Sequence, residues 1–153
     1  MRELPAHPVL RSADAVKQVV AYIDGGARGN PGPAGWGARI TTRDGDTIAE
    51  ISGGLPHATN NVAEYHGLVA ALDWCATHGA TDVLIRSDSL LLVQQMRGVY
   101  KVKHEGLKPL YGRARLLALQ IGSVTFEHVR RELNRDADRL ANSAMDDVQR
   151  AQA

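Results

Sequence analysis

Four carboxylates that lie far apart in the sequence have positions suited to holding a divalent cation together. Asp24 and Asp88 each end a buried, β-branched run of residues. Glu64 and Asp138 stand near the starts of two amphipathic helical patterns. Two carboxylates at adjacent strand ends repel each other, so a cation must bridge them or one must take up a proton. Because no imidazole or thiolate accompanies them, the four form a hard oxygen site that favours Mg²⁺ or Mn²⁺ over zinc.

Each of these carboxylates also has a purely structural interpretation. Asp24 precedes two glycines and could belong to a hairpin turn. Asn61 and Glu64 have capping-box spacing, so Glu64 could satisfy its own helix N-terminus. Asp88 could cap the short helix that follows it, and Asp138 could interact with a helix dipole. Since all four interpretations would have to hold at once, we favour one shared site.

Composition describes an ordinary globular chain. The 153 residues are 44% hydrophobic and 23% charged, which fits one domain with a real core. The formal net charge of +1 gives little general support for nucleic-acid binding, so any such signal must be local. The single cysteine, Cys75, excludes an internal disulfide and is expected to be buried.

The sequence shows no targeting or membrane segment. No signal peptide is recognisable, and no stretch approaches the ~18 apolar residues that span a bilayer. We therefore expect a cytoplasmic monomer.

The hydrophobic pattern predicts an α/β fold with three strands, a helix, a strand, two helices, a strand and a final helix. The predicted strands are 18–24, 35–42, 47–51, 82–87 and 124–129, and the predicted helices are 59–78, 90–96, 107–121 and 134–148. Asn134 is expected to cap the last of these helices. Segments 25–34, 52–57 and 130–133 are predicted loops. Three successive strands indicate an antiparallel meander, and strands that follow helices enter the sheet parallel to a neighbour. The result is a five-stranded mixed sheet flanked by helices.

This order predicts where a ligand binds. The meander fills one side of the first strand and the later units fill the other, which makes the boundary between strands 18–24 and 82–87 a topological switch point. Ligands in open α/β sheets bind outside the carboxyl ends of strands at such a point, where Asp24 and Asp88 lie. We expect residues 1–15 to be a flexible leader, 16–148 one domain and 149–153 a frayed tail.

Four motifs, in chain order, resemble those of type 1 ribonuclease H. They are Asp24-Gly25-Gly26 with Asn30-Pro31-Gly32-Pro33-Ala34-Gly35, Thr59-Asn60-Asn61-Val62-Ala63-Glu64-Tyr65, Ser87-Asp88-Ser89, and Asn134-Arg135-Asp136-Ala137-Asp138. The similarity runs from about Val19 to Met145, and the first two motifs are specific in combination. The resemblance implies an RNase H-like fold and a two-metal endonuclease that cuts the RNA strand of an RNA–DNA hybrid. It gives catalytic and metal-binding roles to Asp24, Glu64, Asp88 and Asp138.

The resemblance also implies a substrate groove, in which the protein distinguishes RNA from DNA. The implied groove residues are Gly25, Gly26, Asn30, Thr59, Asn60, Asn61 and Gln94. Backbone groups at the glycines and the amides of Asn60 and Asn61 suit a 2′-hydroxyl, which both donates and accepts. Contacts that go to sugar and phosphate make binding independent of sequence.

The chain departs from the family pattern in two places. Many members carry a mobile histidine in a longer loop before the last carboxylate, but here residues 130–133 contain none. Arg131 or Glu132 could take its place, and His128 is expected to be partly buried on a strand. Many members also have a long basic insertion with tryptophans. Segment 97–115 is shorter and is either a phosphate patch or a solvated helix face; its basic residues are Arg97, Lys101, Lys103, Lys108, Arg113 and Arg115.

The function that we predict is hydrolysis of the RNA strand of a hybrid with two Mg²⁺ ions, leaving 5′-phosphate ends; Mn²⁺ is a possible substitute. One alternative is a catalytically silent nucleic-acid-binding module on the same fold. Another is a related nuclease that acts on other nucleic acids. Four converging negative charges near phosphate argue against the silent module, and the Asn60–Asn61 pair favours the hybrid as substrate.

Overall fold

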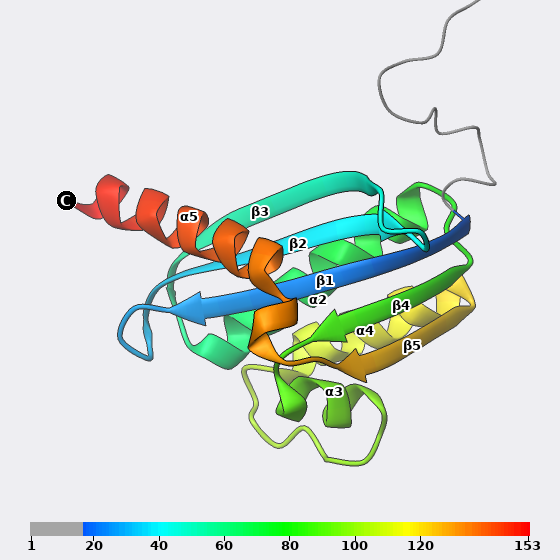
Figure 1. The fold of residues 1–153 in the computed structure, drawn as a ribbon. Helices are drawn as coiled ribbons and strands as arrows, with labels where there is room; N and C mark the ends of the chain where they lie inside the picture. Colours follow the sequence, from blue (N-terminus) through cyan, green and yellow to red (C-terminus); the bar gives the residue numbers. More distant parts are fainter. Residues whose placement is uncertain (1–16) are drawn as a thin grey trace, which may run out of the picture.

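One sheet, with helices on both faces, makes up the computed structural model, which describes residues 17–153 (Figure 1). The strands are β1 (Gln18–Ala27), β2 (Gly32–Thr42), β3 (Thr47–Ala58), β4 (Asp82–Ser87) and β5 (Ser123–His128). They lie in the order β3-β2-β1-β4-β5. The first three strands pair antiparallel, whereas β4 pairs parallel with both β1 and β5. The five-stranded mixed sheet predicted from the sequence is therefore confirmed. The predicted leader, 1–15, lies outside the described residues.

The helices divide between the two faces of this sheet. They are α2 (Asn60–Thr77), α3 (Leu90–Met96), α4 (Lys108–Ile121) and α5 (Arg135–Gln152), with one short 3-10 helix, η1 (Arg131–Leu133). Figure 1 shows α5 in front of the sheet and α2 and α4 behind it. Helix α5 packs on β1, β2 and β3, whereas α2 packs on β1 and β2 and also against α4. No helix within residues 17–153 is long and apolar enough to cross a membrane.

The main core lies between the sheet and α2 and α4. Alternate residues of the central strands supply one side of it, because successive side chains of a strand point to opposite faces. Among its fully buried members are Ala21, Ile23, Val83, Ile85, Leu68 and Leu72. Cys75 is also buried there, as predicted.

The strands of the three-stranded meander are longer than the sequence suggested. Segments 25–34 and 52–57 were predicted to be loops, but β1 continues to Ala27, β2 begins at Gly32 and β3 continues to Ala58. Glycine and proline lower strand propensity, yet here they fit specific neighbours. A Cβ on Gly53 would lie 2.5 Å from the Trp36 ring, so only glycine leaves room for it. Pro56 is tolerated because β3 is an edge strand with a register shift nearby.

The last helix is also longer than predicted. Residues 149–153 were expected to fray, but α5 continues through Gln152. The side-chain amide of Gln152 donates to the carbonyl oxygen of Pro56 at 2.9 Å, which ties the end of α5 to β3. The predicted loop 130–133 contains η1.

Two glycines let the helices approach the sheet closely from opposite faces. A Cβ on Gly25 would lie 2.5 Å from both the backbone nitrogen of Glu64 and the carbonyl carbon of Ala63 in α2. A Cβ on Gly37 would lie 2.5 Å from the Leu140 Cβ in α5. Real Cβ atoms do not come so close to other atoms. Both helices therefore depend on glycine for their distance from β1 and β2.

We expect Gly37→Ala to lower the free energy of unfolding by about 1–3 kcal/mol, because the added methyl group must push α5 away from the sheet. Gly112→Ala is the matched control. Gly112 lies in α4 with nothing within 4 Å of its Cβ position, so the same change should raise stability by up to ~1 kcal/mol. Urea unfolding of both variants measures the difference. A Gly37→Ala variant as stable as the parent would contradict the packing argument.

Candidate active site

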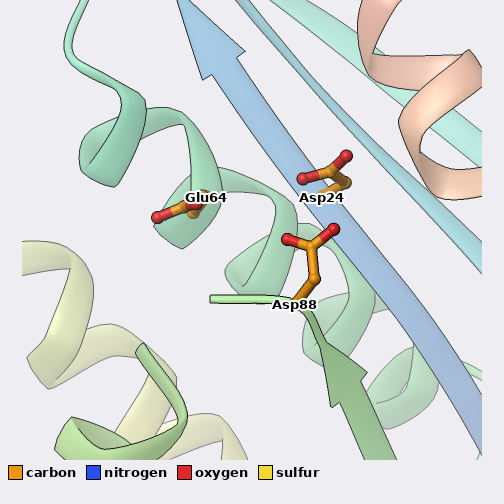
Figure 2. Close-up of side chains that lie close together, drawn as sticks. All are labelled: Asp24, Glu64 and Asp88. Carbon is orange, nitrogen blue, oxygen red and sulfur yellow. The ribbon is translucent and has the colours of Figure 1, made fainter. Parts of the chain in front are cut away.

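Three carboxylates meet beside β1. Asp24 lies in β1, Glu64 in α2 and Asp88 directly after β4, and one oxygen from each lies within 4.8 Å of the others. Figure 2 shows the three side chains close together, extending from β1, from α2 and from the end of β4. All three are partly buried. Sequence positions 24, 64 and 88 are thus brought to one point by the sheet and the helix packed on it.

The sheet opens at this point because β4 ends. The last β1–β4 pair joins Ile23 to Ser87, whereas β1 continues beside β2 as far as Ala27. The expectation that Asp24 ends its strand was therefore wrong. Asp24 lies within β1, opposite Gly37, at the position where β4 turns away. A carboxylate from α2 can approach Asp24 there because β4 no longer lies beside β1.

Asp138, the fourth predicted carboxylate, approaches from the other face. It lies in the first turn of α5, is exposed, and is not a member of the close trio. It borders the same pocket of about 350 Å³ as the other three. Its carboxylate accepts from the Asn142 side chain at 3.2 Å. The structure therefore gathers all four predicted carboxylates around one pocket, with Asp138 at the rim.

The capping interpretations of Glu64 and Asp88 are wrong. Thr59 caps α2, since its hydroxyl accepts from the backbone N–H of Val62 at 3.2 Å. Ser89 caps α3 in the same way. Glu64 and Asp88 are therefore free to face the pocket. Asp138 does lie where the α5 dipole favours an acidic residue, so its dipole interpretation holds together with its place at the pocket.

Burial and mutual repulsion make this site costly to ionise. Burial first, and then the negative charges of Asp88 and Asp138, together raise the pKa of Asp24 to about 8, although a hydrogen bond from the Gly25 N–H acts to lower it. Burial is also the main reason that the pKa of Glu64 rises to about 7; a hydrogen bond with Ser89 lowers it and the charge of Asp88 raises it. Both groups therefore titrate near neutral pH, where a divalent cation can compete with protons for them. The donor set, all carboxylate oxygen, fits Mg²⁺ or Mn²⁺.

The predicted groove residues fall into two neighbouring pockets. Gly25, Gly26, Asn60 and Arg131 border the carboxylate pocket. Asn30, Thr59 and Asn61 share with Asn60 a second pocket of about 240 Å³, whose other wall is His104 and Leu107. Asn60 belongs to both pockets and is held by two contacts. Its side-chain oxygen accepts from the Ala27 N–H at 2.7 Å, and its backbone N–H donates to the Asn30 side chain at 2.9 Å. Gln94 borders neither of these two pockets.

His128 lies on a strand, β5, as predicted, but its burial was predicted incorrectly. It is exposed rather than partly buried, because β5 is an edge strand that α5 does not cover. Its ring Nε2 lies 3.2 Å from the carbonyl oxygen of Asp88.

Two contributions to the site escaped sequence analysis. Asn134 was expected to cap α5, but its side chain makes no capping bond and instead contacts Ile23 and Asp88. An asparagine suits a helix cap and a hydrogen-bonded link between strands equally well, so no sequence signal distinguishes the two roles. Arg28 also borders the pocket, where Asn142 accepts a hydrogen bond from its guanidinium at 3.1 Å.

Comparison with known proteins places the chain in a family. Residues 22–144 match the family described as "Reverse transcriptase-like". The bifunctional protein Rv2228c of Mycobacterium tuberculosis is 52% identical over 130 residues, which are 84% of this chain and 36% of that protein. The chain thus spans about a third of the length of the first curated relatives that it matches. Ribonuclease HI of Halobacterium salinarum is 42% identical over 131 residues, covering 86% of this chain and 66% of that protein.

Solved structures agree with the sequence matches. The N-terminal RNase H domain of the Mycobacterium tuberculosis protein superposes with a TM-score of 0.86 at 49% identity, covering 89% of this chain and 99% of that one. LC11-RNase H1, solved in complex with an RNA/DNA hybrid, superposes with a TM-score of 0.83 at 42% identity, covering 86% of this chain and 99% of that one. With most of its length matched in both sequence and fold, the chain belongs to the ribonuclease H family.

Proposed function

We propose that this chain hydrolyses the RNA strand of RNA–DNA hybrids as a metal-dependent endonuclease and leaves 5′-phosphate ends. One observation carries the proposal: Asp24, Glu64 and Asp88 bring oxygens within 4.8 Å of one another in an open pocket. A nuclease is what the ribonuclease H relatives indicate. A silent binding module gains nothing from such a cluster, since the carboxylates repel the phosphates that it would have to bind.

The carboxylates would hold the metal. Asp24, Glu64 and Asp88, completed by Asp138, provide oxygen ligands for two Mg²⁺ ions or for Mn²⁺ in their place. Held by these residues, two such ions would supply an activated water for in-line attack on the phosphate and charge stabilisation for the leaving 3′-oxygen. What remains for the protein is to position the substrate and to hold four negative charges together.

Backbone and amide groups beside the carboxylates suit an RNA strand. Gly25 and Gly26 both border the pocket, and Gly26 has no side chain to keep a sugar-phosphate backbone away from β1, whereas the missing side chain of Gly25 makes room for α2. Because the Asn60 side-chain oxygen already accepts from Ala27, its NH₂ group is left to donate to a 2′-hydroxyl or a phosphate oxygen. Such contacts recognise sugar and phosphate rather than bases.

The basic segment 97–115 is smaller as a phosphate patch than its composition suggests. Lys108 pairs with Glu105 at 2.7 Å, and Arg113 lies 3.6 Å from Asp73. Arg97 donates to the carbonyl oxygen of Phe126 at 2.6 Å and is held against β5. Lys101 and Lys103 are exposed and make no ion pair within residues 17–153. We infer modest affinity for the hybrid, with a salt dependence set by the few phosphate contacts that these side chains can make.

Arg131 is the better of the two replacements for the family's loop histidine. Both Arg131 and Glu132 lie exposed in η1, but only Arg131 borders the carboxylate pocket. A guanidinium there attracts phosphate, whereas a carboxylate would repel it. We propose that Arg131 contacts the phosphate at the cleavage site.

Cleavage of a labelled RNA–DNA hybrid tests the main proposal. With Mg²⁺ the RNA strand should be cut to 5′-phosphate products, and a chelator should abolish cutting. Asp24→Asn should lower turnover by more than ~100-fold, since a metal ligand contributes at least as much as its supporting partners. Asp147→Asn, a surface change on α5 away from the pocket, is the matched control. Uncut RNA with metal present would refute the proposal, and tight hybrid binding without cutting would favour the silent module.

Replacing Arg131 tests its contact with phosphate. We expect Arg131→Ala to lower turnover by roughly 10-fold, because one charge-assisted phosphate contact is lost. Glu132→Ala, its neighbour in η1, should remain close to the parent. Steady-state rates on the same hybrid compare the two. If both changes lowered the rate equally, Arg131 would make no specific contact with the phosphate.

The raised pKa values predict how stability varies with pH in the absence of metal. In the unfolded chain Asp24 and Glu64 have their ordinary pKa values of 3.8 and 4.5, against about 8 and about 7 in the fold. The folded state therefore binds more protons between these limits, and its stability falls as the pH rises through the folded values. In chelator, we expect the parent to melt lower at about pH 8.5 than at about pH 5.5.

Asp24→Asn separates this effect from other titrations. At about pH 8.5 without metal, the variant should melt roughly 3–8 °C above the parent, because one buried charge and its repulsion with Asp88 are removed. Mg²⁺ should raise the melting temperature of the parent more than that of the variant. Thermal melts across this pH range give both numbers. A variant that melts below the parent at high pH would contradict the claim that the buried, mutually repelling carboxylates destabilise the metal-free protein.

A further inference from the structure

A buried asparagine connects the elements that carry the carboxylates. Asn134 lies at the start of α5, four residues before Asp138, and is only 1% exposed. Its side-chain nitrogen, Nδ2, donates to the carbonyl oxygen of Ile23 at 2.8 Å. The same nitrogen lies 3.4 Å from the Oδ2 atom of Asp88. One NH₂ group therefore contacts both β1 and the carboxylate that follows β4.

The place of these contacts is the point at which two strands part. Ile23 and Ser87 form the last β1–β4 pair, and each directly precedes a carboxylate of the site, Asp24 and Asp88 respectively. Beyond this pair β4 no longer accompanies β1, so Asn134 bonds where the parallel ladder stops. It thereby links the ends of the two strands.

The backbone of Asn134 adds a third connection. Its carbonyl oxygen accepts from the N–H of Asp138 at 3.1 Å, which is the first hydrogen bond of α5. The position of Asp138 at the pocket therefore follows from the position of Asn134.

Helix capping does not explain why this residue is an asparagine. Its side chain makes no capping bond, and its Oδ1 atom is buried without a hydrogen-bond partner in the described part of the chain. Burying an unpaired acceptor costs stability. The NH₂ end, which meets Ile23 and Asp88, is the part that the fold uses.

We propose that Asn134 is a positioning residue that sets the spacing of Asp24, Asp88 and Asp138 for divalent-metal binding. The inference rests on the proposed function in one respect: it takes these carboxylates to be metal ligands. Asn134 acts through them and touches no substrate. Its NH₂ group offsets part of the negative charge of Asp88 and holds the strand ends against carboxylate repulsion. An aspartate of the same shape would instead turn an oxygen toward the Ile23 carbonyl oxygen.

Two substitutions separate the donor from the space that it fills. Asn134→Ala removes the side chain, and Asn134→Asp keeps its volume but loses the NH₂ donor. We expect both to weaken Mn²⁺ and Mg²⁺ binding by roughly 10–100-fold in titration calorimetry, as loss of a partner that orients metal ligands does. At saturating metal, KM for the hybrid should stay within about 2-fold of the parent while kcat falls, because a buried side chain contributes to ligand geometry rather than substrate contact.

Gln95→Ala is the matched control. Gln95 is a buried amide, 4% exposed, that accepts from the Tyr65 hydroxyl at 2.8 Å and borders none of the pockets around the carboxylates. Its loss should lower the melting temperature and leave metal affinity unchanged. Equal loss of metal affinity in Gln95→Ala would reduce the effect of Asn134 to general destabilisation and overturn the proposal.

Other outcomes are equally decisive. Parent-like metal affinity in either Asn134 variant that melts cooperatively would overturn the inference, and so would failure of both variants to fold, which would make Asn134 a folding residue only. A parent that binds metal but does not cut the hybrid would sink the proposed function and leave the calorimetric comparison intact.

Discussion

The early end of β4 is the constraint on which the rest of this structure depends. Carboxylates from α2 and α5, which lie on opposite faces of the sheet, can both approach Asp24 only because β4 no longer lies beside it, whereas β2 still pairs on its other side. The gap leaves backbone groups of β1 without a neighbouring strand, and buried groups of this kind must find partners. Two asparagine side chains provide these partners. Asn134 donates a hydrogen bond to the carbonyl oxygen of Ile23, and Asn60 accepts one from the N–H of Ala27.

Close packing turns this gap into a site. Gly25 allows the backbone of α2 to lie against β1, and Gly37 allows α5 to lie against β2 on the other face. Any larger residue would move a helix outward and carry its carboxylate away from Asp24. Gly25 and Gly37 are therefore needed for the short distance between helix and sheet. Neither is needed for backbone conformation, since neither has a left-handed backbone.

The electrostatic cost of the site is opposed to the stability of the fold. Burial and the neighbouring charges raise the pKa values of Asp24 and Glu64 into the neutral range. A fold optimised for stability alone would not gather like charges in a partly buried pocket. The cost is consistent with a site made for cations, because a bound divalent ion compensates the same charges that destabilise the metal-free protein.

The sequence by itself determined the class of fold, the strand order and the four carboxylates, because hydrophobic periodicity and motif chemistry are local properties that survive without coordinates. Tertiary structure decided the rest. It extended the glycine-rich segments into β1 and β3, where a ring or a helix fills the space beside each glycine. It exposed His128 on an edge strand, and it turned Asn134 from a helix cap into a link between two strand ends. These outcomes depend on which partner stands opposite a residue, and partners distant in sequence are chosen only when the sheet and helices pack.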